Sequence, residues 1–166
     1  MPEYATRLDA VAGGDAELVF LGEVRTPWTD RATCPKNGAE STAPGRIVLA
    51  PRYRPGLASL ETVSHVIVLT WLDRSARDVI ALVPPTDVAR HGVFATRAPD
   101  RPNPIGVTVV EIAEVHEDGL TVLGIDCLDG TPVIDIKPYF ASTDARPDAV
   151  VGWHTQRARP LPPLEA

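Results

Sequence analysis

The chain has 166 residues, of which 44% are hydrophobic and 23% are charged, and its formal net charge at pH 7 is −6. This length fits one domain with a substantial core, and the composition excludes a wholly disordered chain. No apolar run approaches the ~20 residues of a membrane-spanning helix. The acidic balance argues against a generally basic nucleic-acid-binding surface, although a local basic patch is compatible with it.

Short apolar segments separated by proline and glycine predict a series of strands. Residues 1–16 are expected to form a flexible arm. A long loop follows over residues 26–45, and residues 57–62 predict one helical turn. The predicted strands, in chain order, are residues 17–25, 46–50, 64–72, 78–83, 92–96, 105–115, 120–126 and 133–137. The link 116–119 ends in glycine, which predicts a hairpin between the strands on either side of it.

These strands favour an all-β protein, either a barrel or a sandwich. Proline accounts for 17 residues, which is incompatible with a chain of long helices because proline removes a backbone donor. We find no internal repeat and no strand–G-x-G-x-x-G–helix unit, so a doubly wound nucleotide-binding sheet is not supported. The expected organisation is the arm 1–16, one β domain over 17–145, and a C-terminal extension, 146–166, that is partly extended or disordered.

The segment RAPDRPNPIG, residues 97–106, alternates prolines with polar residues before a predicted strand. Proline fixes φ and biases the preceding residue to extended forms, so the segment is stiff before anything binds. Arg97, Arg101 and Asn103 provide directed donors on that stiff frame. The segment predicts either a ligand clamp or a rigid connection in which Arg101 pairs with Asp100.

A second segment, residues 128–139, contains an Asp-Gly turn signal followed by a short strand. Asp135 and Lys137 are two residues apart, so on a strand their side chains point to the same face. The pair predicts either an ion pair or a carboxylate poised as a base beside a charged lysine. Tyr139 adds a hydroxyl group and a ring for stacking.

The two cysteines, Cys34 and Cys127, do not form a disulfide framework and are expected to be reduced, as in a cytoplasmic protein. The first twenty residues do not have the pattern of a secretory signal. A nucleophilic role for Cys34 needs a nearby base, which no motif supplies. The four histidines lack metal-ligand spacing, so no metal site is expected, and His65 is expected to be a core residue.

The order of several segments resembles one known family. The run GVFATRAPDRPNPIGVTVVEI, followed by LDGTPVIDIKPY, closely resembles the TsaA-like family, which is also called the YaeB or TrmO family. Upstream, LGEVRTPW, CPKNG and LETVSHVIVLTWLDR are similar to the family's earlier segments. The resemblance covers residues 17–145, roughly three quarters of the chain.

The resemblance implies a single closed or near-closed β-barrel with short helical turns, acting as a non-Rossmann methyltransferase that uses S-adenosylmethionine. It implies as substrate the N6 atom of threonylcarbamoyladenosine at position 37 of tRNA, and a homodimer with the cofactor pocket near the subunit interface. The cofactor-binding positions that it implies are Pro35, Lys36, Asn37, Asp73, Arg74, Arg97, Val107, Leu128, Asp129, Gly130 and Thr131. The family commonly has Arg-Gln at the positions of Lys36 and Asn37, and histidine at that of Asp73.

Within that resemblance, we expect Asp135 to act as a base or to orient the acceptor, Lys137 to stabilise developing negative charge, and Tyr139 to stack or relay a proton. Arg101 and Asn103 are candidates for contact with the substrate. Two groups of arginines are expected to form a basic strip in a dimer: Arg90, Arg97 and Arg101, which lie within twelve residues, and Arg146, Arg157 and Arg159 near the C-terminus. The alternatives are a methyltransferase with a small-molecule acceptor and a module that only binds S-adenosylmethionine.

Overall fold

The structure is a computed structural model that describes residues 5–7 and 17–154. The described residues form two compact units, each of which is treated separately. The barrel unit consists of residues 17–75 and 104–140, and the insert unit of residues 5–7, 76–103 and 141–154. The separate insert unit was not expected from the sequence.

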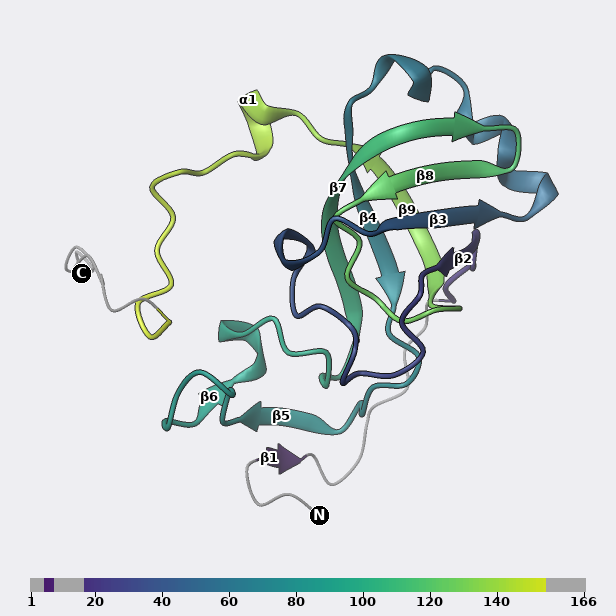
Figure 1. The fold of residues 1–166 in the computed structure, drawn as a ribbon. Helices are drawn as coiled ribbons and strands as arrows, with labels where there is room; N and C mark the ends of the chain where they lie inside the picture. Colours follow the sequence, from purple (N-terminus) through teal and green to yellow (C-terminus); the bar gives the residue numbers. More distant parts are fainter. Residues whose placement is uncertain (1–4, 8–16, 155–166) are drawn as a thin grey trace. The chain divides into compact units, whose positions relative to one another are not determined.

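The barrel unit is a closed sheet in which every pairing is antiparallel (Figure 1). The order around the barrel is β2-β3-β8-β7-β4-β9, and β9 closes it by pairing with β2. The strands are β2 (Gly22–Arg25), β3 (Pro44–Leu49), β4 (His65–Trp71), β7 (Ile105–His116), β8 (Gly119–Leu123) and β9 (Pro132–Pro138). This architecture confirms the predicted all-β barrel, and β7 and β8 form the predicted hairpin.

Strand β4 shows why this sequence forms a barrel wall. Val66, Val68 and Thr70 alternate into the interior, where each is at most 4% exposed. β-Branched side chains fit a pleated, half-buried surface, and burying each valine contributes roughly 1.5–3 kcal/mol. Ile67, Leu69 and Trp71 therefore face outward between β7 and β9.

Short helical turns accompany the barrel, as predicted. They are η1 (Gly38–Glu40), η2 (Pro51–Leu57) and η3 (Leu60–Thr62), and the last two connect β3 to β4. Pro51 opens η2 and Pro55 lies inside it, which suits a tight 3-10 turn because proline cannot donate the backbone hydrogen bond of a longer helix. In the part of the chain that the structure describes, no helix has the length and apolar character that crossing a membrane requires.

The insert unit contains a small three-stranded sheet in the order β1-β5-β6. Its elements are β1 (Ala5–Arg7), β5 (Val79–Leu82), β6 (His91–Gly92), η4 (Val93–Ala95) and α1 (Ala141–Asp144). Val79, Leu82 and Val93 form its buried core. An ion pair between Arg7 and Asp78 links β1 to the residue that precedes β5.

Several local predictions were wrong. Residues 92–96 do not form one strand: Gly92 ends β6, and residues 93–95 form η4, because the backbone N–H and the hydroxyl of Thr96 both bind the carbonyl of Val93 and close a 3-10 turn. The strand predicted over 17–25 begins only at Gly22. His65 is exposed rather than in the core, and its Nδ1 lies 3.0 Å from the hydroxyl of Ser64. Residues 5–7 of the expected arm form a strand; the rest of the arm and residues 155–166 lie outside the described residues.

A substitution at Gly119 tests how closely β8 approaches β3. A Cβ atom at Gly119 would lie 1.8 Å from the carbonyl oxygen of Ile47, a backbone atom that cannot move aside. We expect Gly119→Ala to lower the free energy of unfolding by about 2–3 kcal/mol in urea denaturation. Gly56→Ala is the matched control, because a Cβ there meets no atom within 4 Å. Equal stability of the two variants would contradict the observed β3–β8 register.

Candidate functional site

Three segments meet at one end of the barrel: the loop after β2, the turn after β4 and the turn before β9. Arg31 Nη2 donates to the Ser75 hydroxyl at 3.0 Å. Arg74 Nη2 donates to the carbonyl of Asp129 at 3.1 Å. The backbone N–H of Thr26 donates to the carboxylate of Asp129 at 3.1 Å. These bonds hold the segments together, and we call residues 26–37, 72–75 and 128–131 the loop end.

The turn Leu128–Thr131 presents backbone at the loop end. The N–H and hydroxyl of Thr131 both donate to the carbonyl of Leu128, at 3.1 and 2.7 Å. Gly130 has φ +78°, a left-handed conformation that favours glycine. A Cβ atom at Gly130 would have Arg74 Nη2 as its nearest neighbour, at 4.0 Å. The turn therefore offers an open backbone surface beside a guanidinium group.

The loop carrying Pro35, Lys36 and Asn37 is ordered by its own hydrogen bonds. The Asn37 side chain caps η1 and donates to Glu40 at 2.6 Å, while the Lys36 backbone N–H donates to the same carboxylate at 2.9 Å. Gly38 packs so tightly on Gly124 that a Cβ would lie 2.0 Å from its carbonyl oxygen. Asn37 thus has a structural function, and the Lys36 side chain is exposed.

The outer face of the barrel carries a cross-strand row. Leu69 of β4 is paired with Val107 of β7 on one side and with Asp135 of β9 on the other. Because neighbouring strands are ~4.8 Å apart, Val107 and Asp135 are about 10 Å from each other. Val107, expected to bind the cofactor, and Asp135, expected to take part in catalysis, thus lie on one surface of the barrel.

Asp135 and Lys137 lie on the same face of β9, as their spacing predicted. Their Oδ2 and Nζ atoms are 2.5 Å apart, and Oδ1 of Asp135 accepts the N–H of Ile136 at 2.9 Å. The ion pair is partly exposed, at 37% for the aspartate and 60% for the lysine side chain. Tyr139 follows, with its N–H bound to the carbonyl of His65. The catalytic use of these three residues stays a prediction.

Arg101, in the insert unit, binds the backbone of its own loop. Its Nε donates to the carbonyl of Ala98 at 2.8 Å, and its Nη2 to those of Val93 at 3.0 Å and Thr96 at 2.6 Å. Desolvation and the nearby charge of Arg97 lower the pKa of Arg101. The side chain therefore shapes the loop that carries Arg97. Arg97 and Asn103 are exposed.

The thiols of Cys34, within the loop end, and of Cys127, next to it in the chain, are poor nucleophiles. Cys34 Sγ donates to the carbonyl of Asp126 at 3.4 Å. Burial, and then the charge of Asp126, raise the pKa of Cys34, and the same two causes raise that of Cys127 to about 12. Because the thiolate is the reactive form, neither thiol is activated. Among the residues that the structure describes, no three or more His, Cys, Asp and Glu gather as a metal site.

Sequence reasoning missed the hydrogen bonds from Thr26 to Asp129 and from Arg31 to Ser75, because each bond joins segments that are far apart in the chain. It also missed a cavity of about 540 Å³ next to η2 and η3. Its lining is mostly apolar, with Tyr53 and Asp135 among the polar residues. The apolar spacing of LASLET was the one available signal for it.

A closed antiparallel barrel with polar loops gathered at one end differs from the doubly wound sheet of many nucleotide-binding proteins. Residues 23–145 match the family model described as the tRNA-methyltransferase O N-terminal domain. The chain belongs to this family, which confirms the resemblance seen in the sequence.

Individual relatives agree with this assignment. An S-adenosyl-L-methionine-binding protein of Archaeoglobus fulgidus is 44% identical over 124 residues, which are 75% of this chain and 89% of the relative. The tRNA (adenine(37)-N6)-methyltransferase of Escherichia coli is 37% identical over 144 residues, covering 80% and 61%. The crystal structure of TrmO from Pseudomonas aeruginosa superimposes with a TM-score of 0.70 at 34% identity, covering 84% and 62%.

The chain spans only part of several relatives. It covers 37% of a second Archaeoglobus fulgidus protein, a probable S-adenosyl-L-methionine-binding protein that is 47% identical over 137 residues. It also covers less than two thirds of the Escherichia coli and Pseudomonas aeruginosa proteins.

Thiol reactivity tests the environment assigned to the cysteines. In the native protein at pH 8, we expect iodoacetamide to modify Cys127 at least about 100-fold more slowly than a free thiol, because its pKa is raised to about 12 and it is buried. Cys34, whose pKa is raised and which is half-buried, should also react more slowly than a free thiol. Mass spectrometry of the wild type and of Cys34→Ala separates the two sites. Full reactivity of Cys34 in the folded protein would contradict the assignment.

Proposed function

We propose that the chain is an S-adenosylmethionine-dependent methyltransferase whose acceptor is N6 of threonylcarbamoyladenosine at position 37 of tRNA. The observation that carries the proposal is the row in which Val107 and Asp135 flank Leu69, in a chain of the tRNA-methyltransferase O family. The named activity of the Escherichia coli relative supports transfer to adenine N6 in tRNA. The names of the Archaeoglobus fulgidus relatives support the cofactor.

The groups present at the loop end fit this cofactor. Asp73 is an exposed carboxylate, suited to attract a sulfonium or to accept from a ribose hydroxyl. The open surface over Gly130 admits a planar ring close to the backbone. Arg97 belongs to the insert unit and not to the loop end, and it is a separate candidate because its planar fork is suited to bind a carboxylate in bidentate fashion. When bound, the cofactor supplies an electrophilic methyl group on a positively charged sulfur.

Asp135 is proposed to accept the proton that the acceptor nitrogen loses. The N6 nitrogen of the acceptor is urea-like and a weak nucleophile, so proton removal must accompany formation of its bond to the methyl carbon. A bound S-adenosylmethionine would supply the methyl carbon and would keep the electron pair of its sulfur–carbon bond. Lys137, whose Nζ lies 2.5 Å from Oδ2 of Asp135, is proposed to stabilise the negative charge that develops on the acceptor. Tyr139 is proposed to stack on the adenine ring of the acceptor. Alignment of the reacting groups supplies much of the remaining rate acceleration.

An RNA substrate requires a local basic surface on an acidic protein. Arg90, Arg97 and Arg101 lie within twelve residues of the insert unit, and Arg146 belongs to the same unit. We propose that Arg90 and Arg146 bind tRNA phosphates, that Arg101 acts mainly through the loop that it shapes, and that Asn103 contacts the substrate. Reducing conditions in the cytoplasm, the proposed location, would keep Cys34 and Cys127 as thiols.

The outer face of β7 supports the predicted homodimer. Ile105, Val107 and Val109 are 39%, 44% and 46% exposed and form an apolar stripe on the barrel. Apolar surface of this kind is typical of protein–protein contacts. A second copy packed there would lie at the proposed cofactor site, because Val107, a position carried over to that site, belongs to the stripe.

A module that binds S-adenosylmethionine without transferring its methyl group is the second candidate. The names of several relatives state binding alone, and Asp73 stands where the family commonly has histidine. A small-molecule methyltransferase is a third, since the net charge of −6 does not favour RNA. Methyl transfer separates the first proposal from the second, and the identity of the product separates it from the third.

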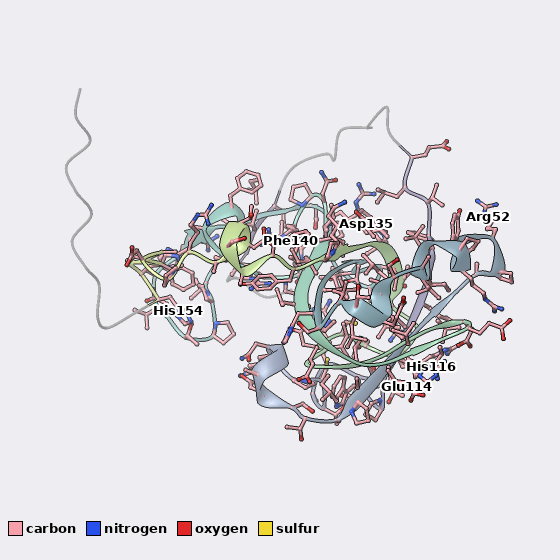
Figure 2. The ribbon with its side chains drawn as sticks, turned by 90° about the horizontal axis from the view of Figure 1, so that it is seen from above. Arg52, Glu114, His116, Asp135, Phe140 and His154 are labelled. Atoms are coloured by element: carbon pink, nitrogen blue, oxygen red, sulfur yellow. The ribbon has the colours of Figure 1, made fainter. Side chains whose placement is uncertain are left out.

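Asp135→Asn tests the catalytic proposal. We expect kcat to fall about 100-fold or more, because the amide cannot accept the proton, while calorimetry gives an unchanged Kd for S-adenosylmethionine. Glu114→Gln is the matched control. Glu114 is 67% exposed, and Figure 2 shows it on a different side of the barrel from Asp135. Wild-type turnover by Asp135→Asn would end the base role.

Val109→Asp tests the dimer. Placing a charge on the stripe should prevent association, so light scattering should report the mass of one chain instead of two. Val88→Asp is the control, because Val88 is 96% exposed and lies in the insert unit. A dimeric Val109→Asp protein, or dissociation by both variants, would contradict an interface on β7.

A further inference from the structure

Trp153 connects the C-terminal part of the insert unit to two of its elements. Its ring stacks on His91 of β6, with centroids 4.4 Å apart and an interplanar angle of 26°. Its Nε1 donates to the carbonyl of Ala95 in η4 at 2.9 Å. Every other residue from 141 to 154 is exposed. Trp153 is therefore the best-buried residue of this segment.

The ring beneath Trp153 is itself held in place. Nε2 of His91 lies 2.8 Å from Oδ2 of Asp87, and Oδ1 of Asp87 accepts the N–H groups of Val88 and Ala89. The bond from His91 is the largest cause of the lowered pKa of Asp87. The carboxylate thus stays charged and fixes the imidazole plane on which the indole rests.

Arg101 also binds the loop that carries η4 and Arg97. The carbonyls of Val93, Ala95 and Thr96 accept bonds from two side chains, the guanidinium of Arg101 and the indole of Trp153. Arg97 follows Thr96 directly and is exposed. A loop tethered twice loses little entropy when it binds a ligand, so its affinity is higher than that of a mobile loop.

We propose that Trp153 is a positioning residue: by holding η4, the C-terminal segment sets the conformation from which Arg97 binds the cofactor. The inference rests on the proposed function for the role of Arg97. The contacts themselves are independent of that role. Residues 146–154 then contribute to cofactor affinity without touching the cofactor.

Two variants of Trp153 separate its contacts. Trp153→Phe keeps a ring on His91 but lacks the donor to Ala95, whereas Trp153→Ala loses both. We expect Trp153→Ala to raise KM for S-adenosylmethionine about tenfold, with kcat within about twofold of wild type, and Trp153→Phe to lie between. Val150→Ala, an exposed apolar residue of the same segment, should behave as wild type.

Amide hydrogen exchange of residues 93–98 gives a readout that does not depend on the cofactor. Faster exchange in Trp153→Ala than in Val150→Ala is expected, with unchanged exchange in the barrel strands. Unchanged exchange would overturn the anchoring contact. Faster exchange with an unchanged KM would overturn the positioning role. Absence of S-adenosylmethionine binding to the wild-type protein would overturn the proposed function, while the exchange result would still decide the anchor.

Discussion

The pairing of β9 with both β2 and β4 is the constraint on which the rest of the barrel depends. It leaves the six-stranded sheet without a free edge, so every strand has hydrogen-bonded neighbours and the interior is sealed by residues such as Val68 and Val133. The same pairing sets Asp135 beside Leu69 and, through β4, on the same surface as Val107. It also delivers the turn before β9 to Arg74. The pairings of β9 therefore both close the barrel and position the residues of the candidate site.

The loop end shows how a chain rich in proline can still order its irregular segments. Polar side chains bind the backbone of neighbouring loops: Arg74 binds the carbonyl of Asp129, and the Asp129 carboxylate binds the N–H of Thr26. In the insert unit Arg101 does the same for the loop of Arg97. Each arginine has several donors in a fixed plane, so one side chain can hold several carbonyls. Such pre-ordering suits methyl transfer, in which alignment supplies much of the rate.

Sequence reasoning succeeded where the signal is local. The alternation in β4 and the glycine-ended link before β8 predicted a strand and a hairpin, and a two-residue spacing placed Asp135 and Lys137 on one face. It failed where a distant partner decides. Strand β1 exists because it pairs with β5, more than seventy residues away. The sequence also failed at residues 93–95 for a local reason, because Thr96 binds back to Val93 and closes a turn in a segment with the composition of a strand. The arginine and tryptophan contacts to η4 have no sequence period, and therefore only the structure reveals them.

The identity of the methylated product is the most direct test of the account. The protein would be incubated with labelled S-adenosylmethionine and with tRNA that carries threonylcarbamoyladenosine but lacks its N6-methyl group, followed by mass analysis of the nucleosides. The account predicts labelled N6-methylated threonylcarbamoyladenosine with the wild-type protein and none with Arg97→Ala. Binding of S-adenosylmethionine by the wild type without any labelled nucleoside would contradict it and leave a cofactor-binding barrel with another acceptor or none.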